Sequence, residues 1–388
     1  MATFNSERLK SARLLAGLSL RQLEDALGAK VTHNSINKYE KGQMQPENGT
    51  ILKLAEVLHV TPSYFFEKNC IELGEIKFRK QSSLTEAEVE LIKEKTKDKV
   101  QRYMEAEKLL NISKKFINPL SRRQVKDPAK AEELAEIVRA EWGLGTNPIP
   151  NVIEMLEENE VKVIEIDASE KFDGLSTYVD DGIPVAVVND SFTIERKRFT
   201  ALHELGHLMM NIKIDDEDEI EIACHRFAGA MLFPASEVRK TLGDRRSNIA
   251  LGELVTIKEE YGISAQAAMR RVLDLGIISN LSYQQFFKKI AGNKKEVGLG
   301  SYKGEEKSYR LLQMVFRLFA EGVITEAKAA ALTGLSSSEL RALFYNIPLD
   351  EIKSDERTNA AFSKAWADDE PEYEDADLLT INPHYEGR

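Results

Sequence analysis

The sequence has few cysteines and no long apolar run. Its 388 residues include two cysteines, Cys70 and Cys224, which are too few for a disulfide scaffold and are typical of a reducing cytosol. No uninterrupted apolar stretch reaches the roughly 18 residues of a membrane-spanning helix. The N-terminal residues MATFNSERLK lack the apolar core of a secretory signal. We therefore expect a cytoplasmic protein without a membrane partner.

Positive charge is also scarce over most of the chain, whose formal net charge is −11. Residues 1–68 differ, because they carry nine Lys and Arg against seven Asp and Glu. Their balance of +2 leaves −13 for the remaining 320 residues. A nucleic acid would therefore meet the least repulsion at this N-terminal segment.

The N-terminal segment predicts a bundle of five short helices, in a chain long enough for two or three domains. Ser19 is a suitable N-cap for the second helix, and Thr32 or Asn34 for the third. The five elements are residues 8–15, residues 20–27, a helix ending near Gly42, residues 51–58 and a short helix after Pro62. Two short helices joined by a tight turn within such a bundle form a helix-turn-helix arrangement.

The stretches GLSLRQLEDALG, INKYEKGQMQP and ILKLAEVLHVTPSYFF resemble the repressor-type helix-turn-helix of the XRE family over about residues 5–67. GAKVTH is longer than the family's usual turn, which leaves the start of the third helix open. The resemblance implies that this helix enters the major groove of a double-stranded DNA operator, and that the protein binds as a homodimer. The implied DNA-contacting residues are Arg21 on the second helix and His33, Asn34, Asn37 and Lys38 on the third. The alternative is a helical bundle that contacts another protein.

Residues 69–126 predict a helical linker. The stretch LTEAEVELIKEKTKDKVQRYMEAEKLL places apolar side chains at helical spacing. They are Val89, Ile92, Val100, Tyr103 and Leu109. This amphipathic helix either connects two domains or forms a dimer contact.

A second domain is predicted over residues 127–282. Two helices, AKAEELAEIVRAEWGL and PIPNVIEMLEENE, precede three extended runs, VKVIEID, LSTYVDD and IPVAVVN. The β-branched content of these runs and the turns at FDG and DDG favour a small, mostly antiparallel sheet. A long helix follows, roughly Thr193–Met210.

The long helix contains ALHELGHLMM, in which two histidines lie four residues apart. Residues i and i+4 project from one face of a helix, so His203 and His207 together can bind one Zn²⁺. Glu204 lies beside this pair, where it can take a proton from zinc-bound water and deliver it to the leaving amine. The alternative is a core helix that happens to carry two histidines.

A catalytic zinc needs a third protein ligand and an open position. Glu221 and Glu219, in the acidic run before ACHRFAGAMLFP, are the candidates. Helical phase favours Glu221, because it shares a stripe with Cys224 and His225, whereas Glu219 points elsewhere.

The stretches RKRFTALHELGHLMMN and EIACHRFAGAMLFP resemble the ImmA/IrrE metallopeptidases, and the similarity covers about residues 127–280. The resemblance implies zinc held by His203, His207 and Glu221, with Glu204 as the catalytic acid–base. His225 stands where the family usually has Asn, and its role would be to orient Glu221, to contact substrate or to stabilise the oxyanion. The implied fold class is a mostly helical α+β protein with a gluzincin-like catalytic core and a helical C-terminal region.

Residues 283–388 form the C-terminal region. The stretch ITEAKAAALTGLSSSELRAL has a pattern like that of the N-terminal helix-turn-helix, but few basic residues accompany it. We therefore interpret it as a packing or dimer element. AWADDEPEYEDAD has seven acidic residues and no basic one. It is either a disordered, solvated tail or an acidic strand that occupies the basic surface of the helix-turn-helix or the protease cleft.

Two functional hypotheses follow. The first is a DNA-binding transcription regulator with a zinc endopeptidase that cleaves a helix-turn-helix repressor or antitoxin and so derepresses genes. The second is a repressor or antitoxin whose protease fold senses zinc or a ligand. Glu204 favours the first hypothesis, because a sensor has no need of a general base.

Overall fold

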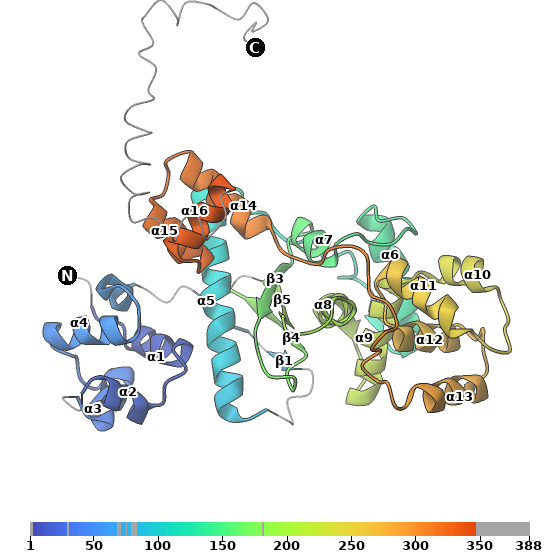
Figure 1. Ribbon diagram of the computed structural model, residues 1–388, viewed down its shortest axis with the longest axis horizontal. Coiled ribbons are helices and arrows are strands. Elements are labelled where there is room, and N and C mark those ends of the chain that lie inside the picture. The colour runs from blue at the N-terminus through green and yellow to red at the C-terminus, as the bar shows by residue number, and fades with distance from the viewer. Residues whose placement is uncertain are drawn as a thin grey trace, which may run out of the picture. The chain divides into compact units, whose positions relative to one another are not determined.

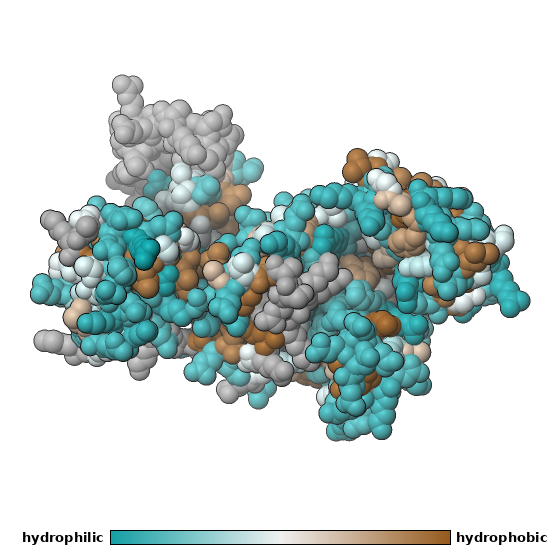
Figure 2. Space-filling view, turned by 90° about the horizontal axis from the view of Figure 1, so that it is seen from below, coloured by the Kyte–Doolittle hydropathy of each residue, from teal (hydrophilic) through white to brown (hydrophobic). Residues whose placement is uncertain are grey.

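The computed structural model describes residues 3–28, 31–67, 71–74, 76–78, 84–180 and 182–346 (Figure 1). The chain divides into two compact units, Met1–Leu311 and Leu312–Arg388. No helix within the described ranges is long and apolar enough to cross a membrane. On the face drawn in Figure 2 the described surface is mainly hydrophilic, and hydrophobic residues form separate patches. Such scattered apolar surface is ordinary for a folded domain.

The first unit begins with the predicted helical bundle. Its elements are α1 (Ser6–Leu15), α2 (Leu20–Ala26), α3 (His33–Glu40), α4 (Asn48–Val57) and the 3-10 helix η1 (Pro62–Phe66). Ser19 and Thr32 cap α2 and α3 by accepting hydrogen bonds from the backbone N–H groups of Gln22 and Ser35. Leu9, Leu23 and other apolar residues from every helix fill one core. The predicted five-element bundle is therefore confirmed.

The next segment differs from the predicted helical linker. The long helix α5 (Glu86–Leu110) begins at Glu86, because Thr85 and Glu88 form a capping box there. The described residues of the segment 71–78, namely 71–74 and 76–78, are not helical; they include β1 (Lys77–Phe78) and the bridge residue Leu73. On α5 the predicted apolar seam is buried at Ile92, Val100 and Tyr103, whereas Leu109 is exposed.

A four-stranded sheet follows, with the order β1-β4-β5-β3. Its other strands are β3 (Lys162–Ile166), β4 (Gly174–Val179) and β5 (Ile183–Asn189). The β1–β4 and β4–β5 pairs are antiparallel, as predicted. The β3–β5 pair is parallel, because β4 reverses the chain between these two strands. A two-stranded parallel sheet joins β2 (Gln124–Val125) to β6 (Asn211–Ile212).

Helices cover both faces of the four-stranded sheet (Figure 1). One face packs against α5, where Ile92 and Val100 share a core with Val185 and Val187. The other face packs against α8 (Ile194–Met209), whose core includes Ala186 of β5. The sheet thus holds α8 in place along β4 and β5.

The helix α9 (Glu217–Leu232) packs against α8. Gly206 permits this close approach, since a Cβ atom there would lie 3.4 Å from the Cα atom of Cys224. The remaining helices of the first unit include the short η3 (Pro128–Lys130). The others are α6 (Ala131–Glu141), α7 (Val152–Glu158), α10 (Ala235–Leu242), α11 (Leu251–Tyr261), α12 (Ala265–Asp274) and α13 (Asn280–Ile290).

After α13, the described part of the C-terminal region contains the helices α14 (Arg310–Ala320), α15 (Glu326–Thr333) and α16 (Ser337–Tyr345). Phe344 of α16 packs edge-on against Phe316 and Phe319 of α14. The predicted helices of this region are confirmed, and its role as a packing or dimer element stays a prediction. The acidic stretch AWADDEPEYEDAD lies outside the described residues.

Candidate metal centre and DNA-reading helices

The helix α8 carries both histidines of the sequence motif, His203 buried and His207 partly exposed. Thr193 precedes it in extended conformation, so the helix begins at Ile194 and reaches the motif after more than two turns. His203 and Glu204 have no exposed surface, because α8 lies between the sheet and α9. The local sequence therefore gives the helical phase, and the two neighbouring layers remove the motif from water.

Glu221 of α9 meets the two histidines. The Nε2 atoms of His203 and His207 lie 3.1 Å apart, and each lies 3.1–3.2 Å from a carboxylate oxygen of Glu221. Burial opposes the ionisation of Glu221, but hydrogen bonds and charge from both histidines outweigh it and hold the pKa of this carboxyl well below its usual range. The side chain of Glu221 is 38% exposed, so the cluster is open to solvent on this side.

The geometry of this cluster fits a zinc ion. Nitrogen and oxygen ligands at about 2.1 Å in a tetrahedron lie roughly 3.4 Å from one another. The three ligand atoms of His203, His207 and Glu221 have similar separations, and the arrangement leaves a fourth position open. Glu219 is not part of the cluster: it is exposed, and its backbone N–H donates to the Asp216 side chain. The structure thus brings Glu221, and not Glu219, to the histidines.

The buried Glu204 follows His203 on α8, and its carboxylate lies against the first residue of β4. A Cβ atom at Gly174, the first residue of β4, would lie 3.1 Å from Glu204 Oε1 and 2.6 Å from Thr200 Cγ2. Position 174 therefore has room for glycine only unless its neighbours move. Sequence reasoning did not select Gly174, although it lies in the predicted turn at FDG.

Tyr178, at the far end of β4, was also not selected from the sequence. Its hydroxyl donates to the backbone oxygen of Leu208 on α8, and burial raises its pKa. Gly174 and Tyr178 therefore fix β4 along the motif helix, one by close approach and the other by a hydrogen bond.

His225 lies one turn after Glu221 on α9. Its Nδ1 atom is 2.7 Å from the backbone oxygen of Glu221, and its ring centroid is 4.6 Å from that of His203. It also lines a cavity of about 270 Å³ together with Phe199 of α8 and Tyr283 of α13. His225 is thus next to the candidate metal ligands and lines the adjoining cavity.

In the N-terminal bundle, α3 begins at His33 with Thr32 as its cap, which resolves the start of this helix. Ile36 and Tyr39 face the core. Arg21, Asn34 and Lys38 are exposed, and Asn37 is half-buried.

The side chain of His33 is held against α2. Its Nδ1 atom lies 2.7 Å from Glu24 Oε2, and this hydrogen bond lowers the pKa of Glu24. His33 therefore has one ring nitrogen engaged within the protein, unlike the exposed Asn34 and Lys38. Ala29 and Lys30 of the long turn lie outside the described residues.

Comparisons with known proteins assign a class to each half of this arrangement. Residues 9–65 match the family model described as Helix-turn-helix. Residues 156–273 match the Peptidase_M78 model, described as IrrE N-terminal-like domain. The second match includes the sheet strands β3–β5, the motif helix α8 and the ligand-bearing α9.

Two curated relatives resemble the N-terminal part. They are described as uncharacterized HTH-type transcriptional regulators, RP497 of Rickettsia prowazekii and RC0668 of Rickettsia conorii, and each is 37% identical over 65 residues. The aligned part is 17% of this chain, and the chain spans about half the length of these relatives, 48% and 50%. The chain thus joins a helix-turn-helix domain of transcription regulators to an M78 domain with a metallopeptidase-type fold.

Proposed function

We propose that this protein is a DNA-binding regulator whose zinc endopeptidase domain cleaves a helix-turn-helix repressor or antitoxin and thereby derepresses genes. The observation that carries the peptidase part is the convergence of His203, His207 and Glu221 beside the buried Glu204. A metal-ligand triad without an adjacent acid would support storage or sensing of the metal, whereas a buried acid beside it is what peptide hydrolysis needs.

The residues divide the proposed chemistry among them. A zinc ion held by His203, His207 and Glu221 would polarise a peptide carbonyl and lower the pKa of water at the site. Glu204 accepts a proton as the water oxygen bonds to the peptide carbon, and donates it to the amide nitrogen as the carbon–nitrogen bond breaks. Atoms and charge balance, because the proton taken from water leaves with the new amine.

We assign His225 a place on the substrate side of the site. Its Nδ1 atom contacts the Glu221 backbone oxygen, and its ring lies beside that of His203. From this position it can donate to a developing oxyanion or contact the side chain that enters the adjoining cavity.

In this proposal the N-terminal domain binds the operator DNA. The third helix enters the major groove, where its DNA contacts are the exposed Asn34 and Lys38, the half-buried Asn37, and His33. Arg21 of the second helix contacts a phosphate. A small charge surplus makes a homodimer on a two-fold operator the expected binding form.

The test is cleavage by the full chain loaded with zinc, using repressor-like proteins encoded by neighbouring genes as substrates. Glu204→Gln keeps the shape of the side chain but removes its basicity. General acid–base groups contribute about 10²–10⁴-fold to rate, so this variant should bind zinc and cleave at most weakly. Equal cleavage by the wild type and Glu204→Gln would remove Glu204 from the mechanism.

A second candidate function is a regulator in which the M78 domain senses zinc or a ligand without proteolysis. The extended linker favours it, because Leu73, Lys77 and Phe78 pair with β4, the strand whose first residue, Gly174, lies against Glu204. Wild-type protein that binds zinc, binds its operator in a zinc-dependent way and cleaves none of these repressors would support the sensor.

A further inference from the structure

The segment between the two domains pairs with the strand next to the candidate metal centre. Gly74 N–H donates to the backbone oxygen of Tyr178 at 2.8 Å, and Leu73 forms a bridge with Val179. Lys77 and Phe78 of β1 continue the antiparallel pairing to Ser176 and Leu175 of β4. The segment thus runs along β4 toward Gly174.

The pairing contains a bulge that requires glycine. Leu73 and Lys77 are four residues apart, whereas their partners Val179 and Ser176 are three apart, so the segment has one extra residue. A Cβ atom on Gly74 would lie 2.9 Å from the Tyr178 backbone oxygen. Seating the segment on β4 therefore depends on the absence of a side chain at position 74.

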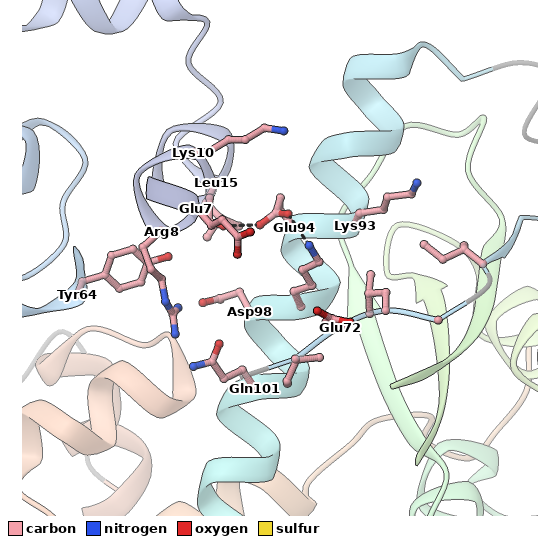
Figure 3. A pocket seen from close by; sticks show the side chains of 16 residues that line it. Glu7, Arg8, Lys10, Leu15, Tyr64, Glu72, Lys93, Glu94, Asp98 and Gln101 are labelled. Carbon is pink, nitrogen blue, oxygen red and sulfur yellow. Dashed lines mark hydrogen bonds and ion pairs between the residues drawn. The ribbon is translucent and has the colours of Figure 1, made fainter. Parts of the chain in front are cut away.

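The start of the segment is also anchored. Ile71 is buried in the core that α5 shares with β4, and the Glu72 backbone N–H donates to the Asp180 side chain. On its other side the segment lines a cavity of about 670 Å³ with α1 and α5. Figure 3 shows Glu72 at this cavity, with Glu94 and Asp98 of α5 and Arg8 of α1 around it.

The edge of β4 that pairs with the linker segment, residues 71–78, is the edge at which an extended peptide could bind. Along its whole length, β4 pairs with β5 on its other side, so within the described sheet a peptide can pair with β4 only where the linker segment lies; the opposite edge of the sheet is β3. The end of this edge is at Gly174, against Glu204. An extended peptide that adds to a sheet edge gains main-chain hydrogen bonds, and here it would lie beside the proposed catalytic group.

We propose that residues 71–78 occupy, within the same chain, the strand position into which an extended peptide substrate must bind. That the competing peptide is a substrate rests on the proposed function. The pairing of the linker segment with β4 does not depend on that function. The linker competes with the peptide for β4. Ile71 lies four positions after Glu67, the last described residue of the helix-turn-helix domain.

The experiment measures binding without cleavage. The full chain carrying Glu204→Gln is titrated against a fluorescein-labelled peptide with the sequence of residues 71–78, IELGEIKF, and anisotropy is recorded. An apparent Kd is the intrinsic Kd divided by the fraction of accessible sites, so an edge open about a tenth of the time weakens binding about tenfold. Adding Gly74→Ala should unseat the linker and tighten binding by about that factor.

Gly292→Ala is the matched control, because a Cβ atom at that position meets nothing within 4 Å. It should leave the affinity of the Glu204→Gln chain unchanged. Hydrogen exchange of peptides covering residues 71–78 and Gly174–Val179 should become faster in Gly74→Ala and stay as in the parent in Gly292→Ala. Equal peptide affinity for Gly74→Ala and its parent, whether tight or weak, would refute the proposal that the linker segment occupies the peptide-binding edge.

Cleavage of casein by the zinc-loaded chains with Glu204 intact separates this inference from the proposed function. Faster cleavage by Gly74→Ala than by the wild type and Gly292→Ala supports both. No cleavage by any chain, together with tighter peptide binding by Gly74→Ala, refutes the peptidase and retains the occupied edge. Cleavage at equal rates shows that the linker does not block the edge and overturns the inference alone.

Discussion

Gly174 and Glu204 lie against each other, so that a Cβ atom at position 174 would be 3.1 Å from Glu204 Oε1. The same Cβ atom would lie 2.6 Å from Thr200 Cγ2 and 2.8 Å from the Val187 backbone oxygen. Overpacking of this kind costs about 1–3 kcal/mol. We expect Gly174→Ala to lower the free energy of unfolding by about that amount, as measured by urea denaturation followed by circular dichroism.

Gly252→Ala is the control for this prediction, since a Cβ atom at position 252 on α11 meets nothing within 4 Å. Alanine is favoured over glycine within a helix, so this change should be neutral or stabilising. A Gly174→Ala chain as stable as the wild type would show that β4 and α8 can separate without cost.

The metal prediction distinguishes Glu221 from Glu219. We expect one zinc ion per chain in the wild type, and loss of stoichiometric zinc in His207→Ala and Glu221→Ala, because each removes one of three protein ligands. Glu219→Ala is the matched control on the same helix and should keep one zinc. The measurement is zinc content after dialysis, by plasma emission spectroscopy. Zinc retained in Glu221→Ala and lost in Glu219→Ala would assign the third ligand to Glu219.

A prediction about pH concerns Glu157, which has almost no exposed surface. Burial raises its pKa to about 7, although Ser308 donates to the carboxylate and Arg310 attracts it. Since an unfolded glutamate titrates near about pH 4.3, the folded state binds more protons between these two values. The stabilising contribution is therefore fully present below about pH 4.3 and is lost as pH rises through about 7.

Glu157→Gln mimics the protonated side chain, so its stability should fall less between pH 5 and 8 than that of the wild type. The full effect of such a pKa difference is about 3 kcal/mol. Thermal unfolding midpoints at several pH values measure this difference, and other titrating groups cancel because both chains share them. Parallel midpoint curves for the two chains would mean that Glu157 is ionised in the folded protein at all these values.

The helices and the candidate metal-ligand residues could be predicted from the sequence because their signals are local. Ser19 and Thr32 cap their helices, and the four-residue spacing of the two motif histidines gives a common face. Helical phase also selected Glu221 over Glu219, since α9 continues without a break through this region.

The sheet edge could not be predicted in the same way. The pairing of residues 71–78 with β4 joins positions about a hundred residues apart, and no local pattern encodes it. Gly74 and Gly174 are needed because a carbonyl or a carboxylate approaches them from elsewhere in the chain. These non-local contacts are also why the predicted helical linker was wrong over this stretch.

The last prediction concerns DNA and the third helix. The helix-turn-helix domain carries a surplus of +2 in residues 1–68, so affinity must come from a few placed contacts rather than from bulk charge. Each phosphate neutralised contributes about −0.9 to the slope of log K against log salt, so a modest slope is expected. Asn37→Ala should weaken cognate binding by about 1–3 kcal/mol and leave non-specific binding nearly unchanged.

Arg21→Ala is the comparison variant, because Arg21 is exposed on α2 and is proposed to contact phosphate. It should weaken binding to all sequences alike, since a phosphate contact carries no base information. Gel-shift titrations against cognate and scrambled duplexes separate the two effects. Equal losses for Asn37→Ala on both duplexes would move base reading to the more exposed Asn34 and Lys38. A wild-type chain that prefers no sequence would instead make this bundle a surface for another protein, because a reader of bases must distinguish the two duplexes.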